Sequence, residues 1–529
     1  MTTASGEKRA ARPPKAVWLP ASVVALFMAL PLAYLFLRSF ERGPSEFFEV
    51  ALDADSLVVL ANSVVLAAIV TAASVFVAVP LAWLTVRTDL PGRKIWAVLA
   101  ALPLVMPSYV GGFVLVSTLG PRGTLQGALE PFGVERLPEI YGLRGAAFAL
   151  TLFTYPYVFL TVRAALRGLD PALEDASRSL GRGAWPTFFS VTLPQLRPAI
   201  VAGSLLVALY ALSDFGVVSL LQFDSFSRAI YLQYRSAFDR TPAAILALML
   251  VALTATVLFF EARTRGRARY HQTSGSVRSA RTISLGRWRL PALVFCGGVV
   301  SLALAVPVGV LFFWLVRGVS MGEPLRLVWG AAWNSVCVSG LAAGVTALAA
   351  LPVAILAVRF PGKVSGTVER LTYVGYALPG IALALAFVFF GANYAPWAYQ
   401  TLGILILAYA IHFLPQAVGA TRSALLQIRP SIEEAAQSLG RSPLNVMATV
   451  TAPLAQRGIL AGAALVFLTT MKELPATLLL SPTGFTTLAT SVWNATSEAF
   501  FARAAAPALL LITVSALPMY LLVIRERGK

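Results

Sequence analysis

Three charged side chains stand in stretches that are otherwise apolar. Asp214 lies in Ala-Leu-Ser-Asp-Phe-Gly, and Lys472 and Glu473 lie in Thr-Met-Lys-Glu-Leu-Pro. A shift of 259 residues places Asp214 on Glu473, so the carboxylate is repeated along the chain. Charges are costly inside a membrane, where they face a cavity or pair with one another. We expect the two carboxylates to line or gate a translocation path, with Lys472 paired to one of them.

The alternative is structural. Gly216 and Pro475 each follow a carboxylate by two residues, which is typical of a broken helix whose end needs a cap or an ion pair. The sequence leaves both interpretations open.

A polar segment is repeated even more closely. Residues 156–194 and 415–453 share 14 identities over 39 positions without a gap, including Ser-Leu-Gly-Arg. Each copy predicts a short helix that begins with acidic residues and ends at Gly181 or Gly440. In the first copy Asp170 is the expected cap. In the second, Ser431 and Glu434 have the spacing of a capping box.

The composition indicates which elements hold these residues. The 529 residues are 58% hydrophobic and 12% charged, against about 25% charged in soluble proteins. Soluble enzymes, disordered chains and disulfide scaffolds are therefore excluded. The net charge of +18 would suggest nucleic acid in a soluble protein, but in an apolar chain it indicates topology, because basic residues gather on the cytoplasmic side.

Apolar stretches of about 20 residues predict membrane-spanning helices. Twelve are found, at 17–38, 58–86, 95–120, 145–166, 198–222, 242–261, 291–316, 332–358, 370–390, 395–419, 458–482 and 504–524. With both termini in the cytoplasm, 30 of the 42 Lys and Arg residues fall in cytoplasmic segments. We therefore predict an all-α, multi-pass protein of the bacterial inner membrane, with lipid as its surroundings and no nucleic-acid partner.

The chain divides into two similar halves. Asn62-Ser63-Val64 matches Asn334-Ser335-Val336, and Val86-Arg87 matches Val358-Arg359, at a shift of 272. An even number of spans in each half makes the repeats parallel. The predicted segments are a cytoplasmic tail 1–16, a six-helix domain 17–261 with its repeated loop at about 163–197, an Arg-rich cytoplasmic linker 262–290, a second six-helix domain 291–524 with its loop at about 420–457, and a tail 525–529.

The repeated loop resembles the EAA loop of permease subunits of ATP-binding cassette importers. The second copy has Glu434-Ala435-Ala436 and Gly440, and the first has the variant Asp175-Ala176-Ser177 and Gly181. The resemblance implies the type I importer permease fold, in which this helix docks on a separate ATPase. The residues expected to couple to the ATPase are Glu174, Asp175, Ala176, Gly181, Glu433, Glu434, Ala435, Ala436 and Gly440.

Ser213-Asp214-Phe215-Gly216 and Lys472-Glu473-Leu474-Pro475 are similar to segments of fused twelve-span permeases for ferric iron, and this similarity covers most of the chain. It implies two ATPase subunits that bind ATP and Mg²⁺, a periplasmic binding protein, and ferric iron as cargo. Related fused permeases for thiamine or phosphonate leave other small solutes open.

The chain itself is not expected to be an enzyme or to bind a cofactor or metal. It lacks the phosphate-binding loop of ATPases, since Gly362-Lys363 is followed by Val364. Cys296 and Cys337 are expected to pack, and His412 is expected to pack or to line a cavity. His271 lies far from His412 in the sequence. A secondary transporter driven by an ion gradient is the main alternative, although it gives no reason for two EAA loops. A membrane scaffold is a weaker one.

Overall fold

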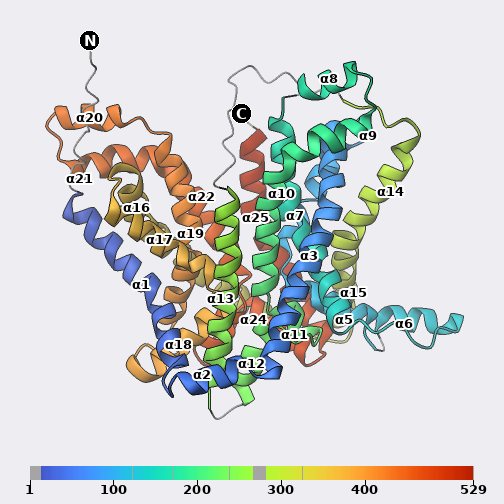
Figure 1. Ribbon diagram of the computed structural model, residues 1–529. Helices are drawn as coiled ribbons and strands as arrows, with labels where there is room; N and C mark the ends of the chain where they lie inside the picture. Colours follow the sequence, from blue (N-terminus) through green and yellow to red (C-terminus); the bar gives the residue numbers. More distant parts are fainter. Residues whose placement is uncertain are drawn as a thin grey trace. The chain divides into compact units, whose positions relative to one another are not determined.

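The computed structural model describes residues 13–121, 123–170, 172–236, 239–265, 282–323 and 326–527. These residues are almost entirely helical (Figure 1). His271, most of the linker 262–290, residues 1–12 and residues 528–529 fall outside the described residues.

Nine helical segments in the described part of the chain are long and apolar enough to cross a membrane. They are α1 (Lys15–Ser39), α3 (Ala54–Arg87), α7 (Leu143–Gly168), Trp185–Ser213 ending in α10 (Leu193–Ser213), Thr241–Phe260 of α13 (Thr241–Arg265), Gly286–Ser320 with α14 (Arg289–Val300) and α15 (Val306–Ser320), Val328–Arg359 of α16 (Arg326–Arg359), α19 (Leu402–Leu426) and Met447–Met471 ending in α22 (Ala452–Met471). Two further pairs of helices are each bent at a short break, and the number rises to 11 if each pair is counted as one span. A shorter apolar stretch, Phe501–Ala516, begins α25 (Phe501–Arg527) where the twelfth span was expected. The expected count of twelve stays a prediction.

The predicted spans 95–120 and 370–390 are not straight helices. The helical segments Arg93–Val105 and Ser108–Phe132 meet at 93°, and Lys363–Gly375 and Gly380–Tyr394 meet at 101°. Pro107 and Pro379 stand at the two bends in extended conformations, with ψ of 145° and 146°. Proline cannot donate to the preceding turn, so a new helix begins after it. The new helices are α5 (Ser108–Leu119) and α18 (Gly380–Tyr394).

The helices form two compact units that do not follow the sequence halves. One unit holds Met1–Phe47, Arg326–Ser491 and Thr513–Lys529, and the other holds Phe48–Leu325 and Val492–Ile512. Helix α1 packs on α16, α17 (Lys363–Ala377) and α18 of the second half. Helices α14 and α15 pack within the unit formed mainly by the first half. The first helix of each sequence repeat therefore packs with the other repeat, while 17–261 and 291–524 remain predicted repeat bounds.

Each unit has the same three-helix centre, α3, α7 and α10 in one and α16, α19 and α22 in the other. Small residues allow these helices to cross closely. A Cβ added at Gly203 would lie 2.7 Å from the Cα of Val158, and one at Gly462 would lie 3.1 Å from the Cα of Ala417. A shift of 259 relates both pairs, so the crossing is duplicated together with the sequence.

The repeated Asn-Ser pair joins α3 and α16 to the loops at the end of each centre remote from the EAA loops. In the unit that contains α3, Asn62 donates to the carbonyl of Asp224 at 3.0 Å, and Ser63 accepts from the N–H of Phe226 at 3.0 Å, where α12 (Phe226–Ser236) begins. Asn334 and Ser335 make the matching bonds, to the carbonyl of Thr486 at 3.0 Å and from the N–H of Leu488 at 2.8 Å.

The end of the linker is attached beside the end of α3. Thr88 and Ile283 form a single parallel bridge, and the Asp89 carboxylate accepts from the Leu285 N–H at 2.9 Å and from Arg289 at 2.9 Å. The Leu285 bond, with help from Arg289, lowers the pKa of Asp89. The linker thus rejoins the first half next to its EAA loop.

Candidate functional site

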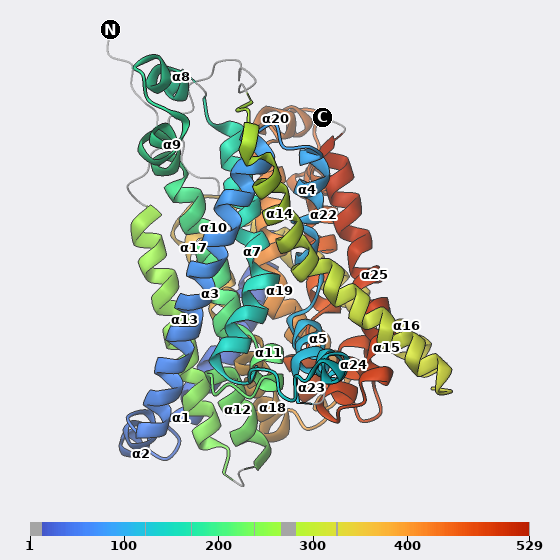
Figure 2. The same cartoon turned by 90° about the vertical axis from the view of Figure 1, so that its right-hand side faces the viewer.

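The two EAA segments are short helices at one end of each unit's three-helix centre. They are α8 (Ala172–Ser179) and α20 (Pro430–Ser438). Helix α8 lies at the opposite end of α3 from α12 (Figures 1 and 2). Asp170 accepts from the Ala172 N–H at 3.0 Å, so the predicted cap is confirmed. The predicted capping box at Ser431 is wrong, because the helix begins one residue earlier, at Pro430. The N-cap residue is Arg429, and its side chain makes no capping hydrogen bond.

Both helices end at a glycine with a left-handed backbone. Gly181 has φ of 82° and Gly440 has φ of 84°. The chain then turns back on itself, and Arg182 N–H donates to the Ser177 carbonyl just as Arg441 N–H donates to that of Ala436, each at 3.3 Å. This is the closure that glycine favours at a helix C-terminus, and it fixes where the next segment leaves each helix.

We expect Gly181→Val and Gly440→Val to uncouple transport while leaving membrane insertion intact. A Cβ meets no atom within 4 Å at either position, so the cost is backbone strain of about 1–2 kcal/mol per site. The turn should shift and α8 or α20 should tilt. The measurement is uptake per chain in the membrane fraction, with Gly340→Val, at an open site on α16, as the control. Normal uptake by both glycine variants would contradict this expectation.

The outer faces of α8 and α20 combine acidic, small and apolar side chains. Asp175 and Ala176 are exposed in the first copy, and Glu434 and Ala435 in the second. Leu180 is 82% exposed. Its counterpart Leu439 is 85% exposed. Matched apolar side chains left in the open at the end of a short helix are typical of a docking surface.

The first acidic residue of each copy faces inward instead. The Glu174 carboxylate lies 3.5 Å from Arg87 Nη2 and accepts from the Thr192 hydroxyl at 3.0 Å. Glu433 lies 2.9 Å from Arg359 Nη2 and accepts from the Thr451 hydroxyl at 2.9 Å. Of the residues expected to couple to the ATPase, these two glutamates therefore bind inside the chain.

The departure of the first copy from the EAA pattern has a local explanation. Ser177, which stands where the second copy has Ala436, is buried. Its hydroxyl lies 3.1 Å from that of Thr187, so the buried polar group is satisfied. This hydrogen bond joins α8 to α9 (Ala184–Thr187). The second copy lacks it, because Val446 stands where the first copy has the threonine.

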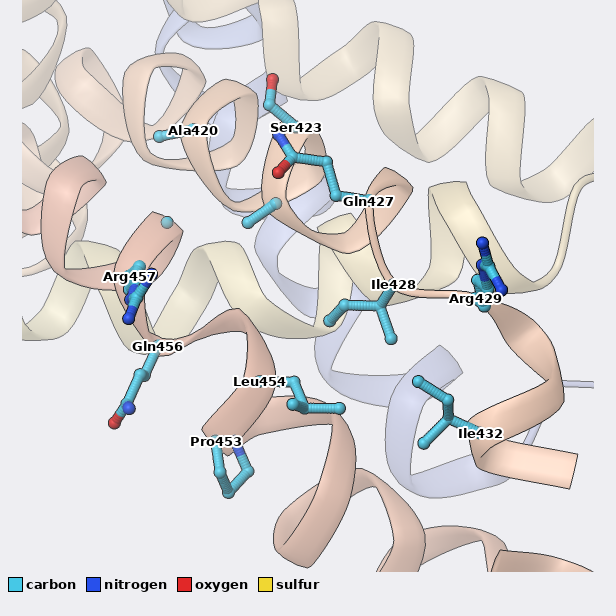
Figure 3. Close-up of a pocket in the computed structure, with 12 residues that line it drawn as sticks. Ala420, Ser423, Gln427, Ile428, Arg429, Ile432, Pro453, Leu454, Gln456 and Arg457 are labelled. Carbon is cyan, nitrogen blue, oxygen red and sulfur yellow. The ribbon is translucent and has the colours of Figure 1, made fainter. Parts of the chain in front are cut away.

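A pocket of about 750 Å³ lies beside the second loop (Figure 3). The end of α19, the start of α20 and the start of α22 line this open pocket, and Arg429 and Arg457 contribute its positive charge. In the first copy Asp170 and Pro198 occupy the corresponding positions. The surfaces next to the two loops therefore differ in charge.

The intramembrane carboxylates lie at broken helices, as the structural alternative anticipated. Asp214 follows α10 and accepts from the Val217 N–H at 3.0 Å, so it caps α11 (Gly216–Leu220). Glu473 accepts from the N–H groups of Ala476 and Thr477 at 2.9 and 3.1 Å and caps α23 (Pro475–Leu480). The pairing of Lys472 and a role in the path stay predictions.

Sequence reasoning did not select the four residues that bind Glu174 and Glu433. They are Arg87, Arg359, Thr192 and Thr451. Each was visible as an identity between the two halves. Their function was hidden because the arginine and the glutamate that it binds are far apart in the chain. His412, expected to pack or to line a cavity, lies in α19 with its ring 4.6 Å from that of Phe413, and Cys296 is buried while Cys337 is half-buried.

The chain belongs to the family described as binding-protein-dependent transport system inner membrane components. The model of this family matches residues 74–270 and 348–528, one stretch in each half. The protein is therefore a multi-pass permease subunit of an ATP-binding cassette importer.

Individual relatives extend this similarity to the whole chain. It is 35% identical over 517 residues to the Fe(3+)-transport system permease protein FbpB 2 of Haemophilus influenzae, covering 97% of this chain and 98% of the relative. It is 26% identical to the ferric transport system permease protein FbpB of Actinobacillus pleuropneumoniae, over 93% of this chain and 75% of the relative. The molybdenum transport system permease protein ModB of Escherichia coli is 38% identical over 141 residues, 26% of this chain and 58% of the relative.

Proposed function

We propose that this chain carries ferric iron across the bacterial inner membrane. The observation that supports iron is the similarity over 97% of the chain to a relative named for Fe(3+) transport. The molybdenum permease resembles only 26% of the chain, so it supports the shared machinery and not the cargo. Thiamine and phosphonate remain the alternatives if iron is not carried.

Two copies of a separate ATPase would dock on α8 and α20, one on each. The support is the duplicated outer face with Leu180 and Leu439 exposed at matching positions. ATP and Mg²⁺ would bind to those subunits, and a periplasmic binding protein would deliver the cargo. Both termini would lie in the cytoplasm, as the excess of basic residues there favours.

ATP binding would draw the two ATPase subunits together and displace α8 and α20. The attached spans would then open outward and accept the cargo, and hydrolysis would reset them. This cycle assigns binding and energy conversion to different subunits, so the chain needs only docking surfaces, helices that transmit motion, and a path.

The test is uptake of radiolabelled ferric iron into proteoliposomes that contain the chain with its ATPase, supplied with the iron-loaded binding protein. ATP-dependent uptake that thiamine, phosphonate and molybdate do not suppress is the expected result. No uptake of iron, together with ATP-dependent uptake of one of those solutes supplied with its own binding protein, would show that this solute and not iron is the cargo.

The two intramembrane carboxylates are proposed to line or gate the path in addition to capping α11 and α23. We expect a D214K/E473K double variant to lose iron uptake, because it replaces two negative charges by positive ones and removes both caps. D214N and E473Q keep an oxygen acceptor for the backbone, so a loss of uptake in these variants would come from the charge alone. Normal uptake by the double lysine variant would remove these residues from the path.

A further inference from the structure

An arginine with little exposed surface attaches each coupling helix, α8 or α20, to the end of a long spanning helix. Arg87 is the last residue of α3 and Arg359 is the last residue of α16. The Arg87 side chain is only 2% exposed, and Glu174 is the one carboxylate that neutralises it among the described ion pairs. Arg359 and Glu433 are 12% and 14% exposed and form the same pair.

Each pair also joins two neighbouring segments. Arg87 donates to the Leu169 carbonyl at the end of α7 at 3.5 Å, and Arg359 donates to the Ile428 carbonyl after α19 at 3.1 Å. The threonine that donates to the glutamate stands in a π-helical turn, Phe188–Thr192 in the first copy and Met447–Thr451 in the second. Those turns lead directly into α10 and α22. Each ion pair, with its threonine, thus connects the end of α3 or α16 to the segment that follows α7 or α19 and to the turn that precedes α10 or α22.

We call the arginine, the glutamate and the threonine of each copy a junction. Such a junction opposes displacement of the coupling helix relative to the spanning helix that carries the arginine. Removing either partner of the buried Arg87–Glu174 pair leaves an uncompensated charge in a medium of low dielectric constant, which is far costlier than breaking an exposed pair. The Arg359–Glu433 pair is part-buried, so the same cost is smaller there. The junction occurs twice with the same residue types, although 25 of the 39 aligned positions around the loops differ. A packing accident does not explain both occurrences.

The far end of the same helix is attached as well. Helix α3 has 34 residues, and Ser63 lies about 36 Å from Arg87 along its axis. Ser63 caps α12, and Ser227 of α12 donates to the Leu212 carbonyl at 3.3 Å, two residues before the break at Asp214. In the other unit, α16 carries Arg359 at one end and Ser335 at the other.

We propose that Glu174 with Arg87, and Glu433 with Arg359, are positioning residues that make each coupling helix and its spanning helix move as one body. Displacement of α8 or α20 by the ATPase is then passed along α3 or α16 to the opposite side of the membrane. This inference rests on the proposed function, because it requires an ATPase that moves these helices.

The first experiment compares the full complex carrying E174Q/E433Q with the wild type. Glutamine keeps an acceptor for Thr192 and Thr451 and removes only the charge. We expect the ATPase to co-purify in equal amount and to hydrolyse ATP at a similar rate, while iron transported per ATP falls at least fivefold. The control is E323Q, which breaks the exposed pair of Glu323 with Arg503 and should leave the ratio unchanged.

A second measurement does not depend on the cargo. Spin labels at Ala172 of α8 and Val58 of α3, in a chain whose two cysteines are replaced by serine, report the distance between the two helices. ATP should leave this distance unchanged in the wild type and should broaden or shift it in E174Q. If E174Q/E433Q does not insert, T192V/T451V removes one bond to the same carboxylate and should change both readouts in the same direction.

The outcomes separate the two claims. A wild-type complex without ATP-dependent uptake overturns the proposed function. A wild-type complex that transports, combined with an unchanged ratio and an unchanged label distance in the variants, overturns the positioning role alone.

Discussion

A Leu180→Glu/Leu439→Glu double variant is expected to insert into the membrane but to lose its ATPase and all uptake. Both leucines are more than four-fifths exposed at the ends of the coupling helices, so they contribute nothing to the packing of the chain itself. An apolar anchor at the centre of an interface is worth about 2 kcal/mol or more, which is about thirtyfold in affinity at each site. Glutamate removes that contact and adds a charge that the interface must desolvate.

The measurement is the amount of ATPase that co-purifies with the chain. Each single variant should retain half of the wild-type amount, because one docking site remains, and yet should transport poorly. Leu125→Glu, on α6 (Thr124–Leu129) at the end remote from α8 (Figure 1), is the control for an added surface charge. Full retention of ATPase by the double variant would show that the outer faces of α8 and α20 are not the docking surface.

Bulky side chains at Gly203 and Gly462 are expected to destabilise the chain more than any other substitution on the spanning helices considered above. At Gly203 a Cβ alone would lie 2.5 Å from the Thr161 hydroxyl and 2.7 Å from a backbone atom of α7. At Gly462 the nearest atom, on α19, is 3.1 Å away. Overpacking a close crossing costs about 1–3 kcal/mol of folding free energy for each site. Valine at Gly203 should cost more stability than valine at Gly462, because the nearest atoms at Gly203 are closer.

Thermal unfolding of the purified chain in detergent measures this loss of stability as a lower unfolding temperature. Gly309→Val on α15, where a Cβ meets no atom within 4 Å, is the matched control and should unfold like the wild type. Equal unfolding temperatures for Gly203→Val, Gly462→Val and the control would mean that α7 and α10, and α19 and α22, do not cross at these glycines.

Hydropathy predicted most of the spanning helices because an apolar stretch of sufficient length has few other structures available in a membrane. It did not predict the bends within 95–120 and 370–390, because hydropathy does not record the effect of Pro107 and Pro379 on the helix. It also could not show that α1 packs with the second half of the sequence. All the spans are similarly apolar, so their partners depend on the shapes of contacting surfaces that composition does not record.

The repeat predicted the position of the coupling helices but not which face points outward. Glu174 and Asp175 are adjacent and chemically alike, and only the packing of α8 turns the first toward Arg87 and leaves the second exposed. The identities at Arg87 and Arg359 marked them as important without indicating why. Their partners lie 74 or more residues away in the chain, so the sequence carries no local signal of the contact.

The central claim is that ATP hydrolysis by a separate subunit, docked on the two coupling helices, drives iron through this chain. The most direct measurement is uptake of radiolabelled ferric iron by proteoliposomes in which the chain, the ATPase and the loaded binding protein are added or omitted one at a time. The account predicts uptake only when all three are present with ATP. Uptake driven by a proton or sodium gradient in the absence of the ATPase would contradict it and would identify a secondary transporter.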